Sequence, residues 1–311
     1  MSIGVKAATT YECDSRPASD IGRVARLDLV FAYRRGRTVL AHAYAEPPFR
    51  VGRLLDAGAM RPSDRMGPLG PSGRMGPLGP SGSMGPIAHM ILAWSGPGLF
   101  AGDRLEQRVR VERGARVLLV SQAALQLHPA AATGPASLHS WYDIDDDAML
   151  DCFWDPVIPF AGARLTQRID LRIAAGGDLF WSDALMSGRV GRGETWGFAV
   201  LDHELRASVD GSLTYLERYD LAPPSRAVTH AWSASRANYF GTTIVRSPIA
   251  TAGRAEEAQS RLRAIDGVRA GVDCLAPNLA VGRLLAENGP PFASARGVLR
   301  DVFDRPALRR T

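Results

Sequence analysis

The 311-residue sequence has little lysine and no long apolar run. Lys6 is the only lysine, so arginine supplies nearly all of the 37 basic residues, and these are interleaved with 32 acidic ones. Proteins that bind nucleic acid usually gather their basic residues on one face beside aromatic platforms, and this sequence has no such cluster. No apolar run approaches the length of a membrane span. We therefore expect neither a nucleic-acid partner nor a membrane partner.

Cysteine is also scarce. Cys13, Cys152 and Cys274 lie far apart and form no C-x-x-C pair, which argues against a disulfide scaffold and against a zinc ribbon. So few cysteines are typical of a reducing compartment, and the first residues show no charged-then-apolar signal pattern. The sequence predicts a cytoplasmic protein.

The common catalytic motifs are missing as well. The sequence has no G-x-S-x-G elbow, no Walker glycine–lysine pair and no histidines at i and i+4. The run 143–147 begins like a calcium loop, but Ala148 replaces the required glycine and Trp154 stands where the bidentate glutamate belongs. The sequence therefore predicts a protein that is not an enzyme and has no tightly bound cofactor.

Alternating apolar and polar residues recur along most of the chain, each run followed by a turn and a returning run. The turns are centred near residues 114, 147, 177 and 211. Each half-buried pair of strands has to cover its apolar face with another, so the pattern predicts stacked antiparallel strands in a layered or helix-like arrangement. Strong helix formers predict a short helix at 253–265 and a second at 294–303. We expect an all-β fold with a small α part, in which 275–285 fits either a strand or a helix.

Two segments differ from this pattern. Residues 1–21 are polar and irregular, which predicts a flexible tail. Residues 65–73 are repeated as 74–82, within a stretch rich in Gly, Pro and Ser that cannot bury enough apolar surface to offset its chain entropy. We expect a disordered insertion at 61–86 within a single β scaffold domain at 22–311.

The most distinctive stretch is residues 185–196, which lies between two apolar runs and contains Gly188, Arg189, Gly191, Arg192, Gly193 and Glu194. It fits a glycine-rich turn with solvated arginines. It also fits a packed corner in which Arg189 or Arg192 pairs with Glu194. A dinucleotide-binding loop is excluded, because the glycine order is G-x-x-G-x-G and a strand pattern follows.

Four carboxylates stand at the ends of expected strands: Asp103, Asp155, Asp183 and Glu194. A single carboxylate in such a place is usually a turn residue or a member of an ion pair. Together, these four could line a polar interior path.

Four motifs carry a family resemblance. They are Gly98-Leu-Phe-Ala-Gly102-Asp103, the run 117–124 with Ser121 and Gln122, Asp155-Pro-Val-Ile-Pro-Phe160, and Gly188–Glu194. In order and spacing they resemble the urease accessory protein D family (UreD, also called UreH), over residues 22–304. The resemblance implies a non-enzymatic scaffold of stacked β-strands. It would act with UreF and the GTPase UreG to deliver nickel to apo-urease, through a tunnel proposed as the nickel path and as a possible dimer within the accessory complex.

The resemblance also implies roles for residues of these motifs. Nickel would be transient cargo, passing Asp103, Asp155, Asp183 or Glu194 through intervening water, since oxygen ligands favour passage over tight capture. The remaining motif residues would be structural or functional elements of the scaffold: Gly98, Gly102, Ser121, Gln122, Gly188, Arg189, Gly191, Arg192 and Gly193. Two alternatives stay open. One is a β-rich hydrolase that uses two of these carboxylates as acid and base, and the other is an interaction module with no metal role.

Overall fold

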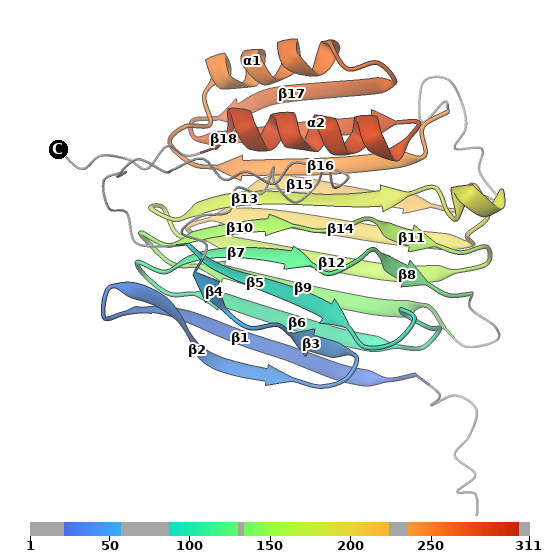
Figure 1. Ribbon diagram of the computed structural model, residues 1–311, viewed down its shortest axis with the longest axis horizontal. Helices are drawn as coiled ribbons and strands as arrows, with labels where there is room; N and C mark the ends of the chain where they lie inside the picture. The colour runs from blue at the N-terminus through green and yellow to red at the C-terminus, as the bar shows by residue number, and fades with distance from the viewer. Residues whose placement is uncertain (1–21, 57–86, 130–133, 224–235, 305–311) are drawn as a thin grey trace, which may run out of the picture.

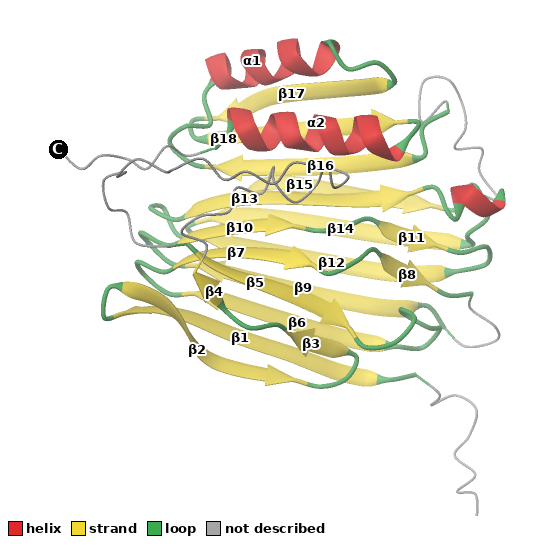
Figure 2. Cartoon of the chain, in the orientation of Figure 1, coloured by secondary structure: helices red, strands yellow, loops and turns green. Residues whose placement is uncertain are grey.

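In a computed structural model the chain forms two β-sheets packed face to face, with two helices beside one of them (Figure 1). The structure describes residues 22–56, 87–129, 134–223 and 236–304. Strands account for most of these residues, as the secondary-structure colouring of Figure 2 shows. The predicted all-β class with a small α part is confirmed.

Sheet A has seven strands, in the order β15 (Ser212–Leu221), β14 (Val200–Val209), β12 (Arg164–Ile173), β9 (Ala136–Ile144), β6 (Arg104–Val111), β1 (Val24–Arg34) and β2 (Arg37–Ala45). Sheet B follows the order β17 (Val268–Ala276), β18 (Leu279–Ala286), β16 (Tyr239–Arg246), β13 (Asp178–Met186), β10 (Met149–Phe153), β7 (Arg116–Ser121), β5 (Ala88–Trp94) and β3 (Phe49–Val51). Three short strands lie off this path: β4 (Leu55–Asp56), β8 (Leu125–Leu127) and β11 (Val157–Pro159).

The pairing within the central repeating units differs from the antiparallel prediction. The two strands of each unit lie in different sheets, β6, β9 and β12 in sheet A and β7, β10 and β13 in sheet B, and each pairs in parallel with its counterpart in the next unit. The turns stack too, since Gly114 N donates to Asp147 O and Asp147 N to Gly176 O. Each unit is thus one coil of a helix-like stack, which was predicted. Antiparallel pairs remain towards the ends, including β1–β2, β14–β15 and β16–β18.

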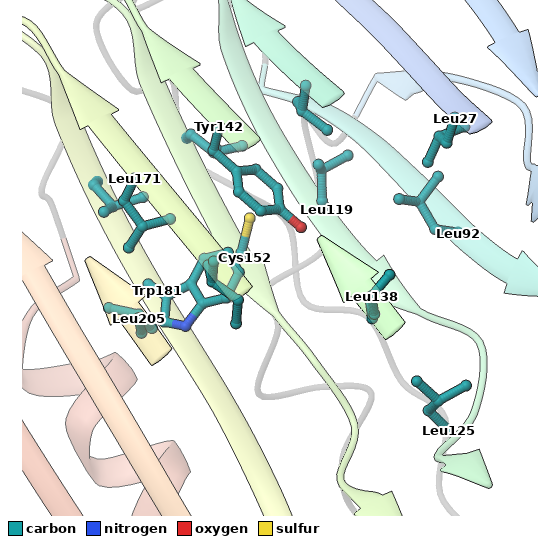
Figure 3. Packing of buried hydrophobic residues seen from close by; sticks show 14 of the residues in the cluster. Leu27, Leu92, Leu119, Leu125, Leu138, Tyr142, Cys152, Leu171, Trp181 and Leu205 are labelled. Carbon is teal, nitrogen blue, oxygen red and sulfur yellow. The ribbon is translucent and has the colours of Figure 1, made fainter. Parts of the chain in front are cut away.

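The main core lies between the sheets. Strand β6 shows why: its buried residues alternate strictly with exposed charged or polar ones, so one face of the strand points to sheet B and the other to solvent. Tyr142 of sheet A and Trp181 of sheet B meet in an edge-to-face contact with ring centroids 4.9 Å apart, beside the buried Cys152 (Figure 3).

Both predicted helices are present. Helix α1 (Ala252–Arg263) is capped by Thr251, whose side chain accepts a hydrogen bond from Arg254 N. Helix α2 (Gly289–Val302) begins five residues before the predicted start, because prolines in the first turn are compatible with a helix. The segment 275–285 is mainly strand, in β18. A second apolar cluster packs α2 against the outer face of sheet B through Phe180, Phe292 and Leu299.

The predicted tail at 1–21 and the predicted disordered insertion at 61–86 lie outside the described residues. The strands that flank the insertion pair directly, with Leu55 opposite His89 and Asp56 opposite Ala88. Opposed Cα atoms in such a ladder lie about 5 Å apart, so a short turn is able to close the gap.

Replacing residues 58–86 by a four-residue turn is therefore expected to leave the melting temperature of the protein unchanged. The reason is that the ladder between β4 and β5 keeps all of its pairs. Differential scanning calorimetry of the two proteins checks this. Loss of soluble protein, or a clearly lower melting temperature, would show that the insertion contributes to the fold.

Candidate functional site

A cavity of about 580 Å³ lies between the two sheets. Its apolar walls combine aliphatic side chains with several aromatic ones, including Trp94, Trp154, Trp181, Trp196 and Tyr219. Its polar lining comes from both sheets and includes Gln107, Ser121, Asp155, Gln167, Asp183, His203, Glu217, Thr242 and Arg283. The cavity therefore brings together ionisable groups that lie more than 100 residues apart in the chain.

Asp183 lies on the inner side of β13, and its Oδ2 accepts a hydrogen bond from Trp181 Nε1 at 3.1 Å. Burial raises the pKa of Asp183 to about 7, with a further contribution from the nearby charge of Glu217. Near neutral pH this carboxyl is therefore able to release a proton when a cation approaches.

Asp155 follows β10 and is held by Ser121. The Ser121 hydroxyl donates to Asp155 Oδ2 at 2.9 Å, and the Asp155 N–H donates to Ser121 Oγ at 2.7 Å. This reciprocal pair gives Ser121 a positioning role at the cavity wall. Gln122 does not share it, because its side chain is exposed and its backbone N–H pairs with Leu92 O.

Arg296 places a buried positive charge behind these two carboxylates. It reaches in from α2, donating through Nε to Ser182 Oγ at 3.0 Å and through Nη2 to Trp154 O at 2.9 Å. Burial lowers the pKa of Arg296 to about 10, and the charges of Asp155 and Asp183 oppose that shift. The outer helix thus contributes a fixed cation next to the cavity.

Asp103 is buried outside the cavity, in a cluster of hydrogen bonds with Arg23 and the loop 98–103. Its carboxylate accepts from Arg23 N at 2.9 Å, from Phe100 N at 2.9 Å and from the Arg23 guanidinium. Although burial disfavours the charged form, these hydrogen bonds outweigh it and lower the pKa of Asp103. The guanidinium also donates to Gly98 O, and Gly98 and Gly102 adopt φ values of +134° and +79° that favour glycine.

The stretch 185–196 forms the packed corner that was one of its two interpretations. Arg189 pairs with Glu194, and its guanidinium lies 4.0 Å from the ring centroid of Phe160. Gly188 has φ +144°, and a Cβ there would lie 2.3 Å from Glu194 O, so only glycine fits. The helical turn Val190–Arg192 follows, ending at Gly193 with φ +73°. Gly191 and Arg192 are exposed on this turn.

Glu194 therefore has structural partners, and like Asp103 it is not part of the cavity lining. The hydrogen bond from Arg189 lowers the pKa of Glu194 despite the opposing effect of desolvation. We expect Glu194→Gln to lower the melting temperature of the protein modestly, because the amide is a weaker partner for the Arg189 guanidinium. Thermal melts of the two proteins measure the difference. An unchanged melting temperature would contradict this structural role.

Polar residues of the cavity lining that were not predicted from the sequence include Gln107, Gln167, His203, Glu217, Thr242 and Arg283. His203 is buried, its Nδ1 lies 3.0 Å from Gln167 Oε1, and its ring stacks on Tyr219. Burial lowers the pKa of His203 to about 4, so the imidazole is neutral at physiological pH. A signal for some of these residues exists in the alternation: Gln107, Gln167, Asp183 and His203 each occupy an apolar-phase position between buried hydrophobic neighbours.

No three histidine, cysteine, aspartate or glutamate side chains of the described residues form a cluster able to hold a metal ion. A divalent cation in the cavity would therefore meet one or two protein ligands at a time and keep much of its water. In the described part of the chain, neither helix is long and apolar enough to span a bilayer.

Comparison with known proteins places this site in a family. The model of the UreD urease accessory protein matches residues 23–310. The chain belongs to the UreD family of urease accessory proteins. It is 26% identical to the urease accessory protein UreD of Halalkalibacterium halodurans, over 91% of this chain and 95% of that protein. It is 29% identical to the protein of the same name from Delftia acidovorans, over 94% and 92% of the two chains. The cavity, the hydrogen-bonded cluster around Asp103 and the Arg189–Glu194 corner all lie within the part that the UreD model matches.

Proposed function

We propose that this UreD-family protein is a non-catalytic chaperone that supports GTP-dependent nickel insertion into apo-urease together with UreF and UreG, in the cytoplasm. Nickel is its transient cargo and not a resident cofactor. The observation that carries the proposal is the cavity between the sheets, in which Asp155, Asp183 and Glu217 face an interior lined by both sheets.

Of the four predicted carboxylates, Asp155 and Asp183 line the cavity. We therefore propose a nickel path along these two residues and Glu217, which also lines the cavity. Asp103 and Glu194 support the path indirectly, by holding the loop 98–103 and the corner 188–196. Carboxylate oxygens and one neutral imidazole are acceptable ligands for a borderline cation such as Ni²⁺, and two ligands at a time favour release.

The charge balance of the cavity suits a cation that moves on. Arg283 at one side and Arg296 at the other offset part of the negative charge of the three carboxylates. A cavity with uncompensated carboxylates would trap a divalent ion, whereas a partly compensated one lowers the cost of its departure. We propose that passage, and not storage, is the task of this interior.

A hydrolase would use two of the same carboxylates as acid and base. Glu217 is poorly suited to that role, because Thr242, Tyr215 and Arg283 all donate to its carboxylate. We propose that the purified protein hydrolyses no glycoside. Turnover that disappears in Asp155→Asn would favour the hydrolase instead.

The test of the proposed function is maturation of urease with and without this chain. Urease, UreF and UreG from the same source are co-expressed in a host that has no urease genes, and the purified urease is assayed for nickel and for ureolysis. We expect both to depend on this chain and on supplied nickel. Equal nickel content without the chain would contradict the function. Dependence on the chain without any change in nickel content would favour a metal-independent interaction module.

A further inference from the structure

Sheet A ends at β15, while sheet B continues through β16, β18 and β17 (Figure 1). Glu217 of β15 and Arg283 of β18 both line the cavity, so this edge of sheet A forms a rim of the cavity. Arg283 of β18 lies at this rim. About half of its side chain is exposed (52%), yet the same residue contributes to the cavity lining. The wall between cavity and solvent is therefore a single side chain thick here.

This side chain bridges the two sheets. Arg283 Nη1 donates to Oε1 of the buried Glu217 on β15 at 3.2 Å, and Nη2 lies 3.1 Å from Glu217 Oε2 in the same ion pair. Its Nη2 also donates to the Tyr215 hydroxyl at 2.8 Å, and Tyr215 in turn donates to Glu217 at 3.1 Å. No backbone pairing joins β15 to sheet B among the described strands, so these side chains close the rim.

A line of polar groups leads inward from the rim. Arg283, Thr242 and Asp183 are paired in register across β18, β16 and β13. Neighbouring strands lie about 4.8 Å apart, so each step is short enough for a hydrated ion to pass from one group to the next. The Thr242 hydroxyl contacts Glu217 at 3.0 Å, which joins the rim carboxylate to this line.

The inner end of the line offers free ligand atoms. Asp183 has one hydrogen bond to the described residues, from Trp181 to Oδ2, which leaves Oδ1 open to the cavity. His203, which is 3% exposed, uses Nδ1 towards Gln167, and Nε2 has no hydrogen-bond partner in the described part of the chain. In a metal-binding histidine the second nitrogen is usually fixed in this way by an outer partner.

We propose that Arg283 is the resident cation of a cation-exchange port: a hydrated divalent metal ion displaces its guanidinium from Glu217 at the rim and then passes to Asp183. The identity of that ion as nickel rests on the proposed function. When Asp183 is ionised and Arg283 is in place, the carboxylates of Glu217 and Asp183 and the Arg283 guanidinium together carry a net charge of −1. A divalent ion that displaces the guanidinium neutralises both carboxylates, whereas one that joins it leaves an excess positive charge in a low-dielectric site.

The test uses the full-length purified protein and nickel chloride. The indole of Trp181 donates to Asp183, so an ion bound at Asp183 quenches its fluorescence, and stopped-flow quenching follows uptake. Arg283→Met removes the resident charge and keeps an apolar stem. We expect nickel uptake about tenfold faster than in the wild type, because the carboxylates then attract the ion unopposed. The amplitude of the fast quenching should fall in a Trp181→Phe variant, in which Trp154, with its ring centroid 6.0 Å from that of Trp181 in the wild type, still reports the ion.

Arg218→Met is the matched control. Arg218 lies on β15 next to Glu217, 67% of its side chain is exposed, and its partner is Glu204 on the outer face of sheet A. It should take up nickel at the wild-type rate. Equal rates in the wild type, Arg218→Met and Arg283→Met would overturn the port and leave the ion pair as a structural latch only.

Glu217→Gln decides the matter if Arg283→Met does not fold. The amide still accepts from Thr242 and Arg283 but no longer attracts a divalent ion, so uptake should be severalfold slower than in the wild type. An unchanged rate would overturn the port. The test of the port is separate from the test of the proposed function. If the wild-type protein matures urease and the Glu217→Gln variant takes up nickel at the normal rate, only the port is refuted. Failure of the wild type to mature urease refutes the function alone.

Discussion

Replacing Asp151 by alanine is expected to lower the free energy of unfolding by about 3–5 kcal/mol, the cost of leaving one member of a buried ion pair without its partner. Asp151 of β10 accepts a hydrogen bond from Arg300 of α2 at 2.7 Å, and the two side chains are 3% and 11% exposed. The Arg300 guanidinium also lies 4.8 Å from the ring centroid of Phe180. The variant would leave this charge buried between helix and sheet.

Urea denaturation of the wild type and the variant measures the difference. The control is Asp301→Ala, which removes an exposed carboxylate on the same helix that contacts Arg261 at 3.4 Å. Exposed pairs of this kind contribute about 0–1 kcal/mol. If the two variants lose similar amounts, the buried pair does not fasten α2 to sheet B as the structure indicates.

Replacing Asp183 by asparagine is expected to have the opposite effect and to stabilise the protein above neutral pH. Folding raises the pKa of this carboxyl from 3.8 to about 7, so ionisation costs more in the folded protein than in the unfolded chain. The penalty is absent below pH 3.8, grows as the pH rises and is complete above pH 7. A shift of this size corresponds to about 4 kcal/mol, which the uncharged amide avoids.

Urea denaturation at pH 4 and pH 8 tests the sign. The variant should gain stability over the wild type at pH 8 and little at pH 4. Asp143→Asn is the control, because its exposed carboxylate on the outer face of sheet A contacts Arg172 at 3.4 Å and gains nothing from losing its charge. A variant at position 183 that is less stable than the wild type at pH 8 would mean that the carboxylate stabilises the fold. If the variant is more stable at pH 8, the Asp183 carboxyl reduces the stability of the fold, which indicates that it is kept for a functional reason.

The sequence pattern was sufficient to predict where the strands lie, but not which strands pair with one another. A period of two residues marks a half-buried strand such as β6, yet it does not say whether the next strand turns back in the same sheet or crosses to the other. At the turns at Gly114 and Asp147 the chain crosses from sheet A to sheet B. Where both strands of a unit cover each other across the core, parallel pairing along the stack follows.

The predicted set of four carboxylates illustrates the same limit at the site. All four were predicted at strand ends, but Asp183 lies inside β13, which continues to Met186. Asp103 finds its partner in Arg23, 80 residues away, and Glu194 finds Arg189 within its own loop. Within the described residues, Asp183 and Asp155 have no such ion-pair partner and face the cavity instead. Glu217 lies in phase with Tyr215, Tyr219 and Leu221 on β15, the same signal that marks His203, but Leu216 in the opposite phase obscures the alternation there.

The most direct test of the account is the nickel content of urease matured with Asp183→Asn, compared with the wild type and Asp143→Asn at matched amounts of soluble accessory protein. If the interior carboxylate serves nickel passage, urease matured with Asp183→Asn should contain severalfold less nickel, although this variant is the more stable protein at pH 8. Asp143→Asn should mature urease normally. Full nickel content with Asp183→Asn would contradict a nickel path through this cavity.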